Sequence, residues 1–179
     1  MELIPAQVIA RDLVTDHKTI TINKGTDHGL KPGQAVLTVS GAVGYIFKPA
    51  SKSSHVMLIT DRYSVVDALI QKTRAHGLIE GSKTNESCVL QYVERTEDIK
   101  NGDLIVTGGL DNIFPKGFPL GVITSIERKT KSTSLHIEVK PVVDANKIEE
   151  VFIVKSTASE NFLSETAKTD EVTKTSKNE

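Results

Sequence analysis

Hydrophobic and polar residues alternate with a period of two along much of this chain. The alternation is clearest over residues 18–23 and 134–140. Such a pattern places one face of an extended strand on a core and the other in water. We expect further strands over residues 6–12, 35–40, 43–48, 55–60, 65–71, 77–81, 88–94, 103–107, 120–128 and 148–155. The chain is therefore predicted to be nearly all β.

Turn signals separate these strands, and they include Lys31-Pro32-Gly33, Lys100-Asn101-Gly102 and Pro115-Lys116-Gly117. Helical periodicity never lasts longer than two turns, so we expect single helical turns only within residues 24–30, ending at Gly29, and 60–65. The chain has no Trp, only 4% aromatic residues and 12 Gly. Because its apolar content is mostly Val, Ile and Leu, a sandwich or barrel is favoured.

The composition changes at residue 156. Residues 156–179 are rich in Ser, Thr, Lys and Glu and contain few bulky apolar groups. Such a segment buries too little surface to offset the conformational entropy lost on ordering, about 1–2 kcal/mol per residue for the backbone. We therefore predict a folded region over residues 1–155 and a disordered tail over residues 156–179.

The folded region contains an internal echo. Residues 30–46 resemble residues 99–123, apart from an insertion over residues 110–117. Each copy reads as a tight turn, a buried strand and a returning strand with an internal glycine, which marks a bulge or a barrel corner. We therefore expect two small antiparallel β-barrels of about six strands each. The glycines to which we assign structural roles are Gly25, Gly29, Gly33, Gly44, Gly102, Gly117 and Gly121.

Charge and cysteine content exclude several functions. The chain carries 22 basic and 23 acidic residues, so no global positive field is available to hold nucleic acid, and stacking aromatic groups are sparse. Its single cysteine, Cys88, excludes an internal disulfide and a Cys-based zinc site. No apolar run approaches the ~18 residues that span a bilayer. We therefore expect a soluble chain.

Catalytic and cofactor motifs are also missing. No Gly-x-Ser-x-Gly elbow or Gly-rich phosphate loop occurs, so no cofactor is expected. His17, Asp67 and Ser125 occur in the order His, Asp, Ser, which leaves a chymotrypsin-like hydrolase, active or degenerate, as the alternative on a double barrel. Thr15-Asp16-His17 recurs as Thr26-Asp27-His28. We interpret this repeat as turn caps rather than as a metal site.

The most distinctive candidate for binding is an aromatic loop. Phe114, Pro115, Phe118 and Pro119 lie together in a predicted loop, although the chain has only five Phe. Exposed aromatic side chains anchor interfaces, and proline limits the entropy lost on docking. The alternative is that both phenylalanines fill the floor of the second barrel. Tyr45 and Phe47 form a second candidate pair, for which packing in the core is the favoured interpretation.

Taken together, these elements resemble the periplasmic β-domain of the MreC family of bacterial rod-shape-determining proteins. The similarity covers residues 6–155 and includes Gly29-Leu30-Lys31-Pro32-Gly33 and Ile113-Phe114-Pro115-Lys116-Gly117-Phe118-Pro119. Six segments in register carry it: residues 20–25, 29–36, 41–46, 101–109, 113–123 and 139–144, the last leading into 151–154. Where the family usually has Thr-Ser-Gly, this chain has Thr107-Gly108-Gly109, which predicts a looser turn.

The resemblance implies a non-enzymatic scaffold that maintains rod shape. It implies binding to class B penicillin-binding transpeptidases, to MreD and RodZ, and to the MreB machinery. It also implies a periplasmic location, with one membrane helix and a coiled coil ahead of this domain in the parent protein. Self-association is expected through weak head-to-tail or back-to-back contacts between β-domains, since an unpaired edge strand can add to a neighbour. A generic ligand-binding barrel is a third hypothesis, but barrels of about six strands are normally too narrow to enclose a ligand.

Overall fold

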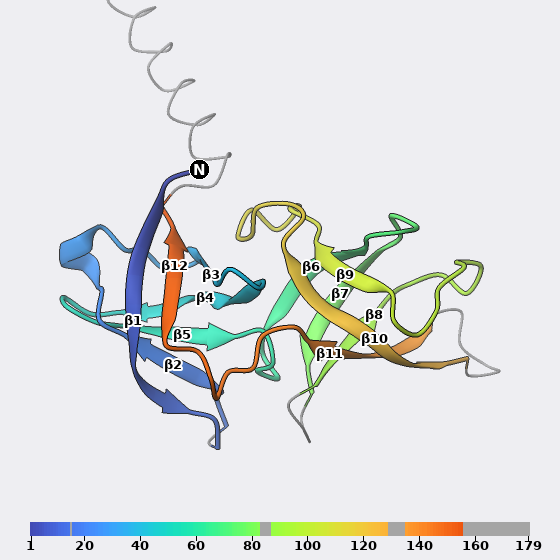
Figure 1. The fold of residues 1–179 in the computed structure, drawn as a ribbon, viewed down its shortest axis with the longest axis horizontal. Coiled ribbons are helices and arrows are strands. Elements are labelled where there is room, and N and C mark those ends of the chain that lie inside the picture. Colours follow the sequence, from blue (N-terminus) through green and yellow to red (C-terminus); the bar gives the residue numbers. More distant parts are fainter. Residues whose placement is uncertain (15, 83–86, 129–134, 156–179) are drawn as a thin grey trace, which may run out of the picture.

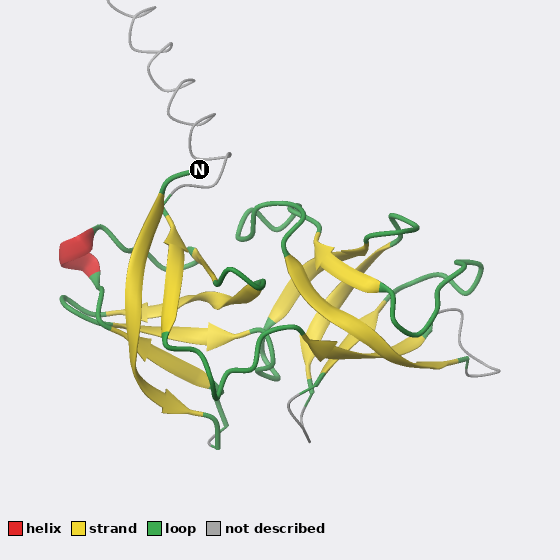
Figure 2. Cartoon of the chain, in the orientation of Figure 1, coloured by secondary structure: helices red, strands yellow, loops and turns green. Residues whose placement is uncertain are grey.

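A computed structural model describes residues 1–14, 16–82, 87–128 and 135–155. In this part of the chain twelve strands form two closed antiparallel barrels, which lie side by side in Figures 1 and 2. Barrel 1 contains β1 (Leu3–Asp12), β2 (Thr19–Ile22), β3 (Ala35–Leu37), β4 (Ala42–Pro49), β5 (Ser54–Leu58) and β12 (Glu150–Val154). Barrel 2 contains β6 (Val65–Ile70), β7 (His76–Gly81), β8 (Cys88–Gln91), β9 (Leu104–Thr107), β10 (Pro119–Glu127) and β11 (His136–Pro141).

The predicted fold class is confirmed. Every predicted strand is present, with boundaries that differ by three residues or fewer. The helical turn predicted within residues 24–30 is a 3₁₀ helix (Thr26–His28), which ends at Gly29 and is drawn in red in Figure 2. Residues 60–65 form hydrogen-bonded turns instead of a helix. The tail predicted over residues 156–179 lies outside the described residues. Within the described residues, no helix is long and apolar enough to cross a bilayer.

The two barrels have the same pairing order. When β12 is matched with β6, and β1 to β5 are matched in order with β7 to β11, each strand pair of barrel 1 has a counterpart in barrel 2. Barrel 2 is built from one continuous stretch of chain. Barrel 1 is interrupted, because β12 returns after barrel 2 to pair with β1 and β3 (Figure 1). Closing barrel 1 therefore depends on strands from both ends of the folded chain.

The two turns of the sequence echo have matching geometry. Gly33 N donates to Ile46 O at 2.8 Å, and Gly102 N donates to Ile123 O at 2.8 Å. Both glycines have positive φ, 82° and 93°, a region that L side chains rarely adopt. The echo in the sequence is therefore accompanied by the same hydrogen bond at the same place in each barrel.

Glycines inside the returning strands face a neighbouring backbone. A Cβ on Gly44 would lie 1.9 Å from Met57 O, and one on Gly121 would lie 2.7 Å from Lys140 O. At Gly25 a Cβ would lie 2.0 Å from a neighbouring carbonyl oxygen, whereas Gly29 and Gly117 have positive φ in open space. The two in-strand glycines thus let adjacent strands approach each other where the barrels bend.

The barrels pack against each other through apolar side chains. One hydrophobic cluster fills barrel 1, and its members include Ile20, Ile22 and Ile46. A second cluster fills barrel 2 and extends to Leu37 and Val154 of barrel 1. Because this second core is shared, burial of apolar surface holds the two barrels together.

Candidate interaction surface

The loop that joins β9 to β10 is held by two aspartates. The Asp67 carboxylate on β6 accepts a hydrogen bond from Leu110 N at 2.9 Å, and Asp67 O accepts one from Gly108 N at 2.9 Å. Asp111 Oδ1 accepts bonds from Ile113 N at 2.9 Å and Phe114 N at 3.1 Å. Together these bonds from backbone amides to the two aspartates fix the loop conformation on the surface of barrel 2.

The structure separates the residues of the predicted aromatic loop. Phe114 is only 2% exposed and belongs to the core of barrel 2, so the packing alternative holds for this side chain. Phe118 is half-buried and packs against the same core, and Pro115 and Pro119 are also half-buried. The exposed apolar group of the loop is Leu110, at 72%. Sequence reasoning missed Leu110, because a single aliphatic residue next to two glycines carries no aromatic signal.

The second predicted pair is also divided. Tyr45 is half-buried against the shared core, its hydroxyl donates to Met57 Sδ at 3.1 Å, and burial raises its pKa. Phe47 is 48% exposed. A bulge shifts the β4–β5 register between Ile46 and Lys48, so Phe47 does not follow the face of Tyr45. Core packing therefore describes Tyr45 and does not describe Phe47.

Gly108, where the chain departs from the usual family pattern, accommodates a carboxylate. A Cβ at this position would lie 2.0 Å from Asp67 Oδ2, the atom that binds Leu110 N. The departure was expected to loosen the turn. In the structure, the absence of a side chain at Gly108 leaves room for the Asp67 carboxylate, which accepts a hydrogen bond from the loop and holds it against β6.

Replacing Gly108 by Ser is expected to lower the free energy of unfolding by about 1–3 kcal/mol, because the new side chain overlaps the Asp67 carboxylate. Urea denaturation of the wild type, Gly108→Ser, Asp67→Ala and the double variant measures the coupling between the two positions. With the carboxylate removed, the serine is expected to cost much less. Additive effects of the two substitutions would contradict this explanation.

The residues of the hydrolase alternative lie on separate elements. His17 is in the β1–β2 loop of barrel 1, where it contacts the rings of Phe47 and Tyr63. Asp67 is engaged with the β9–β10 loop, and Ser125 lies on β10. Burial raises the pKa of the Cys88 thiol to about 12, so this thiol is not a ready nucleophile. The hydrolase alternative is not supported.

The repeated Thr-Asp-His segments have different roles. Asp16 forms an ion pair with Arg62 at 3.2 Å, while His28 Nδ1 accepts a hydrogen bond from Gly25 N at 3.2 Å at the start of the 3₁₀ helix. Thr15 lies outside the described residues. Among the residues with described positions, no group of three or more His, Cys, Asp or Glu side chains has the arrangement of a metal site.

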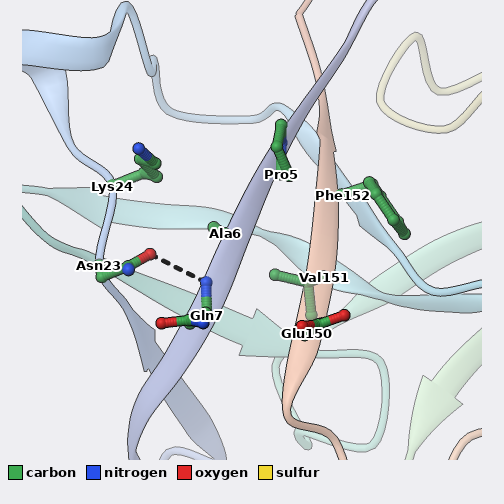
Figure 3. A pocket seen from close by; sticks show the side chains of 8 residues that line it. All are labelled: Pro5, Ala6, Gln7, Asn23, Lys24, Glu150, Val151 and Phe152. Atoms are coloured by element: carbon green, nitrogen blue, oxygen red, sulfur yellow. Dashed lines mark hydrogen bonds between the residues drawn. The ribbon is translucent and has the colours of Figure 1, made fainter.

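A shallow groove of about 290 Å³ lies where β1 and β2 separate. Its lining residues are shown in Figure 3: Pro5, Ala6, Gln7, Asn23, Lys24, Glu150, Val151 and Phe152. Gln7 N donates to Asn23 Oδ1 at 2.8 Å, and Asn23 N donates to Gln7 O at 3.0 Å. On this edge of β1, Pro5 has no N–H to offer. Strand addition is therefore discouraged at the groove.

Comparison with known proteins now places the fold. Residues 8–155 match the family described as rod shape-determining protein MreC, barrel core. The chain belongs to the MreC family. It is 35% identical over 162 residues to the cell shape-determining protein MreC of Bacillus subtilis, a match that covers 84% of this chain. The chain spans 56% of the length of that MreC protein, so it corresponds to about half of such a relative.

Solved MreC structures share the double barrel. MreC from Pseudomonas aeruginosa superimposes with a TM-score of 0.82 at 27% identity, covering 86% of this chain and 99% of that one. A second MreC, from Helicobacter pylori, was solved in complex with the penicillin-binding protein PBP2. It has a TM-score of 0.67 at 19% identity, and the match covers 87% of this chain and 99% of that MreC. At that identity the likeness to the H. pylori protein concerns the fold.

Proposed function

We propose that this chain is a non-enzymatic scaffold domain of the bacterial cell-elongation machinery. In this proposal it binds and organises a class B penicillin-binding transpeptidase in the periplasm and thereby maintains rod shape. The observation that carries the proposal is membership of the MreC family, of which one member with the same fold is bound to a penicillin-binding protein. Contacts with MreD, RodZ and the MreB machinery belong to the same proposal.

The β9–β10 loop supports a role in docking. It combines an exposed aliphatic group, Leu110, with the partly accessible Pro115, Phe118 and Pro119, on a backbone held by Asp67 and Asp111. An apolar side chain on a loop of fixed conformation loses little entropy on binding. We place the transpeptidase contact on this loop.

Self-association is the remaining part of the proposal. The pairing of both barrels is closed, and the edge of β1 next to the groove carries Pro5. Copies of the chain are therefore expected to meet through side chains rather than by adding strands to one another. In the parent protein a coiled coil would raise the effective concentration of these contacts.

Replacing Leu110 by Asp is expected to raise the Kd for the periplasmic domain of a class B penicillin-binding protein at least about tenfold. This corresponds to a loss of about 1.4 kcal/mol in binding free energy. The substitution places a charge in the centre of the proposed contact without removing a core residue. Surface plasmon resonance with the immobilised transpeptidase measures the effect.

Ile9→Asp is the matched control, since Ile9 is 59% exposed on β1 of the other barrel. This variant is expected to bind like the wild type. Equal binding by Leu110→Asp would remove the β9–β10 loop from the interface. Absence of binding by the wild-type chain would overturn the proposed function itself.

A further inference from the structure

An exposed aromatic cluster lies on barrel 1 and contains no residue of the β9–β10 loop. The rings of His17 and Phe47 are nearly parallel, with an interplanar angle of 26° and 6.2 Å between their centroids. The ring of Tyr63 lies 5.1 Å from that of His17 at 39°. Phe47 and Tyr63 are 48% and 56% exposed. Three rings from three separate segments therefore form one exposed aromatic cluster, which we call the aromatic platform.

One buried carboxylate links two of the chain segments that carry the platform. Asp61 is 0% exposed, and its Oδ2 accepts a hydrogen bond from Lys18 N at 2.6 Å while its Oδ1 accepts one from Tyr63 N at 2.8 Å. Lys18 follows the platform residue His17 in the chain, and Tyr63 is itself a platform residue. A single carboxylate thus ties Lys18, which follows His17, to the β5–β6 turn that carries Tyr63, so the backbone next to two of the rings is positioned before any ligand arrives.

One basic and one acidic side chain, Arg62 and Asp16, lie beside the rings. The Arg62 guanidinium lies 4.7 Å from the centre of the Tyr63 ring, and its Nη2 donates to the Tyr63 hydroxyl at 2.8 Å. The same nitrogen is 3.2 Å from Asp16 Oδ1. Because the acid and the base neutralise each other, the platform favours an uncharged ligand that offers many hydroxyl groups.

We propose that the aromatic platform binds a carbohydrate strand of the cell wall. A pyranose ring presents C–H bonds on its face, which are attracted to the negative face of an aromatic ring, and hydroxyls at its rim, which bond to guanidinium and carboxylate groups. The proposal rests on the proposed function only for its location at the cell wall.

Two probes test the proposal. Purified peptidoglycan sacculi, sedimented with the protein, report binding to the polymer. Chitohexaose, titrated into ¹⁵N-labelled protein, reports whether the sugar chain alone is bound, without stem peptides. We expect wild-type protein to pellet with sacculi, and chitohexaose to shift the amide signals of His17, Phe47 and Tyr63.

Phe47→Ala with Tyr63→Ala is expected to reduce the pelleted fraction at least fivefold and to abolish the chitohexaose shifts. Both side chains are about half exposed, and a thermal melt of the double variant verifies folding. Tyr92→Ala is the matched control, because Tyr92 is an exposed aromatic residue (64%) of barrel 2. This control is expected to pellet like the wild type.

Three outcomes would overturn the proposal: no pelleting of the wild type, unchanged pelleting of the double variant, or binding to sacculi without any response to chitohexaose. Loss of transpeptidase binding by the double variant, with pelleting unchanged, would assign the platform to a protein instead. Transpeptidase binding by the wild type is measured in parallel. If that binding persists while sacculi are not bound, the carbohydrate proposal alone fails.

Discussion

Replacing Phe114 by Ala is expected to lower the free energy of unfolding by about 3–5 kcal/mol. Phe114 is one of the largest side chains that are fully buried, and it lies in the core that the two barrels share. Its removal would leave a cavity where Asp111 holds the backbone through the Phe114 amide, so the loop has little freedom to collapse. Chemical denaturation followed by circular dichroism measures the loss.

Phe118→Ala is the matched control. Phe118 contacts the same core but is half-buried, so a loss of about 1–2 kcal/mol is expected. If Phe114→Ala proved as stable as the wild type and lost only partner binding, Phe114 would be an interface anchor rather than a core residue. The pair of variants thus decides between the two interpretations that the loop sequence allows.

Replacing Gly44 by Ala is expected to destabilise barrel 1 by about 3 kcal/mol or more, at the upper end of the usual cost of overpacking. The added Cβ would lie 1.9 Å from Met57 O and 2.8 Å from Met57 C. Both are backbone atoms of a paired strand, so relief requires β4 and β5 to separate. Thermal unfolding by calorimetry is the measurement.

Gly33→Ala provides the comparison for Gly44→Ala. Gly33 has a φ of 82° and no atom within 4 Å of the position of a Cβ, so only backbone strain, about 1–2 kcal/mol, is expected. If both substitutions lowered the free energy of unfolding equally, the close approach of β5 would not be the reason why position 44 requires glycine.

Local pattern was sufficient to predict the strands. Alternation over residues 18–23 and 134–140 marks β2 and β11, because side chains of a strand point to opposite faces in turn and a barrel buries one of them. The glycine of each turn could also be read from sequence, since the positive φ of Gly33 and Gly102 is a local requirement. These signals act within a few residues of chain.

Site residues were predicted less well, because their exposure depends on distant partners. Phe114 and Phe118 read alike in the sequence, yet Asp111 and the barrel 2 core turn one inward and leave the other half-buried. Phe47 was grouped with Tyr45 by its spacing, but a bulge in β4 separates them. The platform that Phe47 shares with His17 and Tyr63 had no sequence signal, because its members come from three separate segments.

The amino-acid sequence by itself therefore determined the all-β class, the strand positions, the turns and the duplicated plan, since each follows from interactions between near neighbours. Only the tertiary structure decided which apolar side chains are covered, how β12 closes barrel 1, and which loops meet around Asp61. The physical reason is that burial and long-range pairing depend on residues brought together by the fold, such as Lys18 and Asp61, whose separation in the chain hides their contact.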